Sequence, residues 1–71
     1  MENINDQITN NLRNEILFSG KPKSQIAKEI GISAPTLSQY LSGRAQPTLA
    51  TLTKLCQVLN ISADEILPIK K

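Results

Sequence analysis

Residues 24–43 read SQIAKEIGISAPTLSQYLSG, and this stretch decides the fold. Isoleucines, leucines and alanines recur at helical spacing on both sides of a Gly-Ile-Ser sequence at residues 31–33. The pattern predicts one short helix over residues 24–30 and a second over residues 34–42. Two short helices joined by so tight a corner are the signature of a helix-turn-helix.

The residues around this corner suit the predicted geometry. Gly31 can adopt the left-handed conformation that ends the first of the two helices. Ser24 and Ser33 are suitable N-caps for them. Pro35 falls at the second helical position, where its missing N–H has no intrahelical acceptor to lose. We therefore expect the Ser33 hydroxyl to accept a hydrogen bond from the Thr36 amide.

The rest of the chain predicts three further helices, over residues of about 5–18, 49–59 and 63–67. In the first two of these, apolar residues recur at intervals of three and four, which gives each helix one buried face. The last begins with a Ser-x-x-Glu capping box at residues 62–65. No segment shows the alternation of a strand. We expect residues 1–71 to form a single compact all-α domain of five helices.

The composition excludes several classes of function. The chain has 71 residues, one cysteine and no histidine, so it can form no internal disulfide and no His/Cys metal site. Its acidic residues are scattered and no nucleophile is paired with a base, so we expect neither an enzyme nor a bound cofactor. No apolar run approaches the roughly 20 residues of a membrane span. A polar segment follows Met1 in place of a signal sequence, and we expect a cytoplasmic protein.

The positive charge is concentrated around the helix pair. Residues 21–60 carry five lysines and arginines against Glu29 alone, a net charge of +4, whereas residues 1–20 have a net charge of −2. No acidic residue occurs between Glu29 and Asp64. Five positive charges in forty residues are not a dense patch. A polyanion could nevertheless approach this region without meeting negative charge.

Residues 24–67 resemble the Cro/repressor-type, or XRE-like, helix-turn-helix proteins of phages and bacteria. The matching segment reads SQIAKEIGISAPTLSQYLSGRAQPTLATLTKLCQVLNISADEIL. The helix before this segment and the PTLATLTKLCQVLNIS helix within it distinguish this type from LacI-type repressors and recombinase tails. The resemblance implies a five-helix fold of the lambda-repressor-like type. It also implies transcriptional repression by a homodimer that binds double-stranded DNA at a partly palindromic operator.

The helix over residues 34–42 would present its polar face to the DNA. At about 100° per residue, Leu37 and Leu41 lie on one side, and the opposite side is small and uncharged. The candidate base readers on this helix are Ala34, Pro35, Ser38 and Gln39. Gln39 is the strongest of them, because its amide can pair with adenine N6 and N7 in the major groove. The plainer alternative is a helix face that meets only solvent.

Phosphate contacts would come from the periphery of that helix. The start of the helix over residues 24–30 brings together N–H groups, a hydroxyl and a positive charge. The phosphate candidates are Lys23, Ser24, Ser33, Thr36, Tyr40, Ser42 and Arg44. Tyr40 is equally compatible with a place in the core. The other lysines of the region, Lys21, Lys28 and Lys54, are expected to be solvated.

One departure from the resemblance concerns an ion pair. Many relatives pair an arginine on the first helix with a glutamate near the end of the third. Ile16 and Leu41 stand at the matching positions. A buried ion pair can be exchanged for packed aliphatic side chains at little cost, so we expect Ile16 and Leu41 to touch.

Two functions remain open at this point. The first is a DNA-binding transcriptional regulator that acts as a homodimer, with Ile66, Leu67 and Ile69 as the candidate interface. The second is an antitoxin or small regulator whose main role is protein–protein interaction. Cys56 is interpreted as a small core residue in either case.

Overall fold

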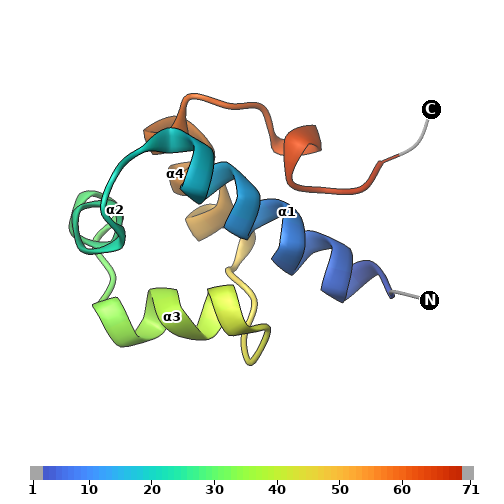
Figure 1. The fold of residues 1–71 in the computed structure, drawn as a ribbon, viewed down its shortest axis with the longest axis horizontal. Coiled ribbons are helices and arrows are strands. Elements are labelled where there is room, and N and C mark those ends of the chain that lie inside the picture. Colours follow the sequence, from blue (N-terminus) through green and yellow to red (C-terminus); the bar gives the residue numbers. More distant parts are fainter. Residues whose placement is uncertain (1–2, 70–71) are drawn as a thin grey trace.

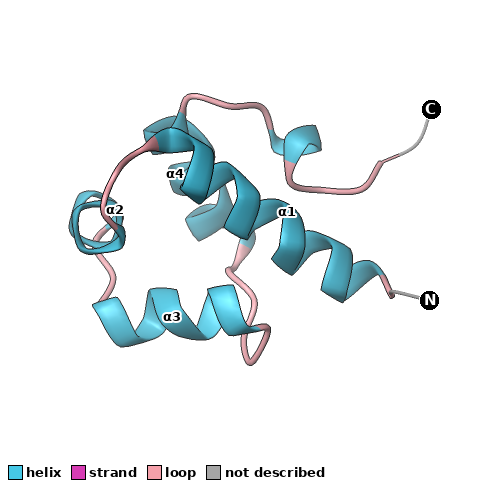
Figure 2. Cartoon of the chain, in the orientation of Figure 1, coloured by secondary structure: helices cyan, strands magenta, loops and turns pink. Residues whose placement is uncertain are grey.

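The computed structural model describes residues 3–69 as four α-helices and one 3-10 turn (Figures 1 and 2). The helices are α1 (Ile4–Ser19), α2 (Lys23–Ile30), α3 (Ala34–Ser42) and α4 (Leu49–Leu59), and the turn η1 spans Ala63–Glu65. No strand occurs in this part of the chain. The prediction of an all-α fold is confirmed, and the four α-helices begin and end within one residue of the expected bounds.

The expectation of a fifth α-helix over residues 63–67 is wrong. A single 3-10 turn takes its place, in which the Ile66 N–H donates to the Ala63 carbonyl at 3.0 Å. The Leu67 N–H also reaches the Ala63 carbonyl, at 2.8 Å, but the helical ladder cannot continue because Pro68 has no N–H to donate. The capping box predicted at residues 62–65 is present, so the start of this element was predictable and its type was not.

Side-chain caps fix the starts of α3 and α4. The Thr36 N–H donates to the Ser33 hydroxyl at 3.2 Å, as expected, and the Thr51 N–H donates to the Thr48 hydroxyl at 3.1 Å. Each cap satisfies an amide that has no partner within its own helix. Gly31 ends α2 in the left-handed region, with φ of 79°, which a residue with a side chain rarely adopts.

The start of α2 departs from expectation. Its N-cap is Pro22, in place of Ser24, and no side chain caps this helix. Pro22 is extended, with φ of −61° and ψ of 144°, and its carbonyl accepts from the amides of Gln25 and Ile26 at 3.1 Å each. The helix therefore begins at Lys23, two residues earlier than it would with Ser24 as its N-cap.

The core lies where the four helices meet. Its buried members are Leu12, Ile16, Ile26, Ala27, Ile30, Leu37, Leu41, Leu52, Leu55, Cys56 and Ile66. Ile16 and Leu41 are both in this cluster, as the aliphatic replacement of an ion pair requires. The Asn11 side-chain amide donates to the Ile66 carbonyl at 2.9 Å, and this bond holds the chain after α4 against α1.

The arrangement of the helices leaves one face of α3 uncovered. In Figure 1, α3 runs along one edge of the fold and the segment after α4 runs along the opposite edge, with α1 between them. α3 packs on α1 and α2. No helix in the part of the chain that the structure describes has the length and apolarity that a membrane crossing requires.

Candidate functional site

The outer face of α3 is small and uncharged. The four residues predicted to read bases are all exposed: Ala34, Pro35, Ser38 and Gln39. Leu37 and Leu41 are buried on the opposite side. Tyr40 is half-buried and packs against the core, so its ring is partly covered. The structure therefore brings the predicted base readers together on one accessible surface.

The start of α3 is almost closed to outside acceptors. The Thr36 N–H is bound by the Ser33 hydroxyl, the Leu37 N–H donates to the Ser33 carbonyl at 3.1 Å, and Pro35 has no N–H. Only the Ala34 amide of this first turn lacks an acceptor among the described residues. The Ser33 and Thr36 hydroxyls also share a hydrogen bond of 2.8 Å. That bond uses one of their two protons, so one O–H of the pair can still donate outward.

The start of α2 is open by contrast. Its N-cap, Pro22, offers no side-chain acceptor, and the amides of Lys23 and Ser24 have no acceptor within residues 3–69. Both side chains are exposed. Two free N–H groups at a positive helix end, beside a lysine, favour an anion. The start of α2 thus has the chemistry that was predicted for a phosphate site, although Ser24 is not the cap.

The loop after α3 is anchored on a single carbonyl. The Gln39 carbonyl accepts from the Ser42 hydroxyl at 3.1 Å and from the amides of Arg44 at 3.1 Å and Ala45 at 3.3 Å. The Ser42 proton is thereby used within the helix, which leaves this side chain only acceptor capacity. Arg44 is exposed, and its guanidinium is available beyond the end of α3.

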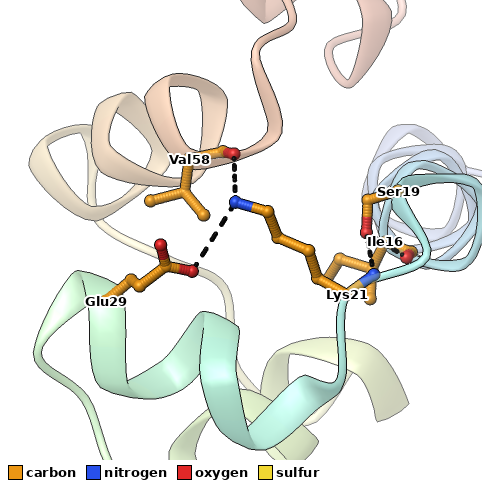
Figure 3. Close-up of polar contacts among 5 residues, drawn as sticks. All are labelled: Ile16, Ser19, Lys21, Glu29 and Val58. Carbon is orange, nitrogen blue, oxygen red and sulfur yellow. Dashed lines mark hydrogen bonds and ion pairs between the residues drawn. The ribbon is translucent and has the colours of Figure 1, made fainter.

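Lys21 was expected to be a solvated charge, and that expectation is wrong. Its ammonium donates to the Val58 carbonyl at 3.2 Å and pairs with a Glu29 carboxylate oxygen at 3.7 Å (Figure 3). Val58 lies in the last turn of α4, where carbonyls have no intrahelical donor and a positive charge is favourable. α4 carries no basic residue in that turn, so Lys21 supplies the charge from the loop between α1 and α2.

A groove of about 660 Å³ lies between α1 and α3. Its α1 wall includes Arg13, Asn14 and Leu17, its α3 wall is Leu41, and Lys23 stands at the start of α2. The sequence predicts no role for Arg13, because position 13 belongs to the polar side of an amphipathic helix and nothing in the pattern shows which neighbour that side meets.

A second groove, of about 490 Å³, lies between α4 and η1. Leu49, Leu52, Cys56 and Leu67 are among its lining residues, and Leu49 is 80% exposed. Burial is the larger cause that raises the pKa of the Cys56 thiol in this groove, and the negative charge of Glu65 is the smaller one.

The three residues predicted to form a dimer interface differ in how accessible they are in the structure. Ile66 is 0% exposed, so its proposed place in an interface is wrong, because its side chain turns inward to close the core. Leu67 is half-buried in the second groove, and Ile69 is 61% exposed. Among the described residues, no three acidic, cysteine or histidine side chains gather where they could hold a metal ion.

Known proteins are similar to this chain in sequence. Residues 19–66 match the family described as Helix-turn-helix. Over 60 residues the chain is 38% identical to the cryptic phage CTXphi transcriptional repressor RstR of Vibrio cholerae, an alignment that covers 84% of this chain and 54% of RstR. The chain therefore spans about half the length of that relative. Over 54 residues it is 38% identical to the HTH-type transcriptional regulator YazB of Bacillus subtilis, with 76% and 78% covered.

A similar fold is found in a solved structure. The solution structure of the SOS-response transcriptional repressor LexA from Eubacterium rectale superposes with a TM-score of 0.86 at 28% sequence identity. The superposition covers 99% of this chain and 74% of that one.

Proposed function

This chain belongs to the helix-turn-helix family, and from that premise we propose that it binds double-stranded DNA specifically and acts as a transcriptional repressor. One observation carries the proposal: two neighbouring helices divide the chemistry that DNA recognition needs. α3 exposes an uncharged polar face with a nearly closed start, and α2 has an open, positively charged start. Base edges suit the first surface and phosphates suit the second.

Base reading falls to α3 in this proposal. The major groove admits a helix, and the side chains of its first turns reach the base edges. Gln39 can form two hydrogen bonds with adenine. Ser38 can donate or accept, and the exposed Ala34 and Pro35 can pack against a thymine methyl group. An uncharged surface suits this task because charge on it would add affinity for any sequence alike.

Phosphate binding falls to the residues around α3. The free amides of Lys23 and Ser24 and the Lys23 ammonium form one donor group at the start of α2. The Ser33–Thr36 pair can donate one hydroxyl proton, and the exposed Arg44 guanidinium lies beyond Gly43. Tyr40 and Ser42 contribute less, since Tyr40 is half-buried and the Ser42 proton is used within the helix.

Binding as a homodimer to a partly palindromic operator is the further part of the proposal. The apolar groove between α4 and η1 supports it, because the exposed Leu49 and the half-buried Leu67 line this groove and are then covered. Exposed apolar patches rimmed by polar residues mark interaction surfaces. The proposed interface therefore excludes Ile66, which was predicted from the sequence, and includes Leu49, which was not.

The experiment for DNA binding begins with selection of bound sites from random duplex DNA. Gln39→Ala should weaken binding to the selected site by about 1–3 kcal/mol and leave binding to an unrelated duplex unchanged. The same variant on the unrelated duplex is the internal control. An equal loss on both duplexes would reject Gln39 as a base reader. A wild-type protein that retains no DNA fragment at low salt would instead favour a protein-binding regulator or antitoxin.

The experiment for the dimer measures mass in solution and on DNA by analytical ultracentrifugation. Leu49→Ser should weaken self-association, whereas Leu17→Ser should not, because Leu17 is similarly exposed, at 75% against 80%, but lies outside the α4 groove. A wild-type monomer at high concentration and on DNA would contradict the dimer. Equal effects of the two substitutions would contradict the interface.

A further inference from the structure

Two positively charged side chains line the groove between α1 and α3. Arg13 and Lys23 line it from different elements, and none of the described residues that line it is acidic. Asn14 and Leu17, which also line it, lie one and four residues after Arg13, so they form one stripe along α1. The groove is therefore bounded by one helix face with an arginine at its centre.

Neither charge is paired with a carboxylate of the described residues. Across residues 3–69 the ion pair between Lys21 and Glu29 is the only one, and both Arg13 and Lys23 are exposed. Glu15 follows Arg13 closely in sequence but does not line the groove. Two unpaired cations that share one groove attract an anion of matching size.

The groove opens beside the proposed base-reading surface. Its α3 wall is Leu41, and at about 100° per residue the exposed Ala34, Ser38 and Ser42 follow outward from Leu41 on that side of the helix. A DNA backbone that flanks α3 on this side would pass the mouth of the groove. The edge of the reading surface and the charged groove are thus continuous.

We propose that Arg13 and Lys23 together bind one phosphate of the DNA strand that flanks α3 on the α1 side. This inference rests on the proposed DNA binding and adds a contact from α1. The Arg13 guanidinium supplies a planar fork of N–H donors that matches two phosphate oxygens, and the Lys23 ammonium supplies a point charge. The contact positions the protein on the duplex and is independent of base sequence.

A carboxylate-bearing protein segment is the other anion that this groove could attract. The apolar Ile16 and Leu41 in its lining would suit such a segment. DNA is favoured because the groove adjoins the base-reading face of α3 and shares Lys23 with the open start of α2. A bound DNA phosphate predicts that Arg13 contributes to the salt dependence of DNA affinity and to its sensitivity to changes in the DNA backbone. A bound protein segment predicts neither contribution.

The first test compares the salt dependence of DNA affinity in Arg13→Gln and in a matched control, Lys54→Gln. Lys54 is an exposed cation on α4 that lines neither groove. Arg13→Gln should make the slope of log affinity against log salt shallower by about 0.9 per subunit, on specific and random duplexes alike. Between 50 and 200 mM salt this reduces the loss of affinity by about 3.5-fold per subunit. Lys54→Gln should keep the wild-type slope.

The second test changes the DNA and compares the wild-type protein with two variants of Arg13. Single phosphates of the selected site are replaced by uncharged methylphosphonates. One position on the flanking strand should lower the affinity of the wild-type protein and lower that of Arg13→Gln less, because only Lys23 still contacts that phosphate, while Arg13→Lys restores part of the sensitivity. If the wild-type protein binds DNA and Arg13→Gln retains both its slope and its sensitivity at every position, the inference is overturned. Failure of the wild-type protein to bind DNA at all would overturn the proposed function instead.

Discussion

α3 and α4 start in the same way and end up with different surroundings. In each helix a hydroxyl at the N-cap accepts from the amide three residues on, Ser33 from Thr36 at 3.2 Å and Thr48 from Thr51 at 3.1 Å. In each, the two hydroxyls of that pair also bond to one another, at 2.8 and 3.1 Å. Both helices end at a left-handed residue, Gly43 or Asn60.

The outer faces of the two helices separate their roles. The accessible side of α3 carries Pro35, Ser38 and Gln39, whereas the accessible side of α4 borders an apolar groove with Leu49 exposed at its start. The caps determine where a helix begins, and they say nothing of its partner. The partner is selected by the few residues that the core does not use, and on these two helices they suit DNA and a second apolar surface.

The largest expected effect concerns the buried leucine that each of the two helices contributes to the core. Leu37 on α3 and Leu55 on α4 are 1% and 0% exposed, so Leu→Ala at either position should lower the free energy of unfolding by about 2–5 kcal/mol. In so small a domain this is a large share of the total stability. Urea denaturation followed by circular dichroism measures it. A loss below about 1 kcal/mol at Leu37 would mean that α3 is not anchored as described.

The N-caps of the two helices provide the next test, because the same substitution should affect their stability equally and DNA affinity differently. Ser33→Ala and Thr48→Ala should each lower the free energy of unfolding by about 1 kcal/mol, and aspartate at either position should restore it. DNA affinity should not follow stability. Ser33→Asp places a negative charge at the start of α3 and should weaken DNA binding, whereas Thr48→Asp should have a much smaller effect. Thermal unfolding and fluorescence anisotropy measure the two properties. Equal losses of DNA affinity in both aspartate variants would contradict the assignment of α3 as the DNA-facing helix.

A smaller effect is expected at the end of α4. Lys21→Met removes the hydrogen bond to the Val58 carbonyl and the exposed ion pair with Glu29. The free energy of unfolding should fall by about 1 kcal/mol, mostly through the lost hydrogen bond, since exposed ion pairs contribute little. Lys54→Met, which removes an exposed charge on the same helix, should leave stability almost unchanged. Chemical denaturation of both variants at equal ionic strength measures the difference.

The smallest effect depends on pH. Because burial raises the pKa of Cys56 above its ordinary value of 9.0, the thiol of the unfolded chain ionises first as pH increases. Ionisation of the unfolded state alone favours unfolding, so this contribution lowers stability as pH rises through that value and is absent well below it. The stability advantage of the wild type over Cys56→Ala should therefore narrow between about pH 8 and pH 10. A constant difference across that range would show that Cys56 is not desolvated.

Much of the fold could be predicted from local patterns. The four α-helices follow from apolar spacing and from caps such as Ser33 and Thr48, whose partners lie three residues away. The exposure of Ser38 and Gln39 follows from the same spacing, because it is fixed by which side of α3 holds its leucines. Such features need no knowledge of the tertiary structure.

Other features could not be predicted from the sequence. They depend on contacts between residues that are far apart in the chain, or on which of two competing local structures is the more stable. Lys21 donates to the Val58 carbonyl, 37 residues away, and pairs with Glu29. Arg13 gains its groove only when α1 and α3 are packed together. At residues 63–67 a strong capping box favoured a helix, but Pro68 and the inward turn of Ile66 favoured a single 3-10 turn.

The hydrogen bond from Asn11 to the Ile66 carbonyl joins residues 55 positions apart and has a consequence for the order of events in folding. The helix pair of α2 and α3 is local, but Ile66 joins the buried core from the segment after α4 and comes late in the chain. Closing so long a loop must precede the gain from the contacts that it brings. We therefore expect a nascent chain to remain incompetent for DNA binding until Ile66 has left the ribosome, so that an incomplete translation product would not compete with the finished protein for its sites.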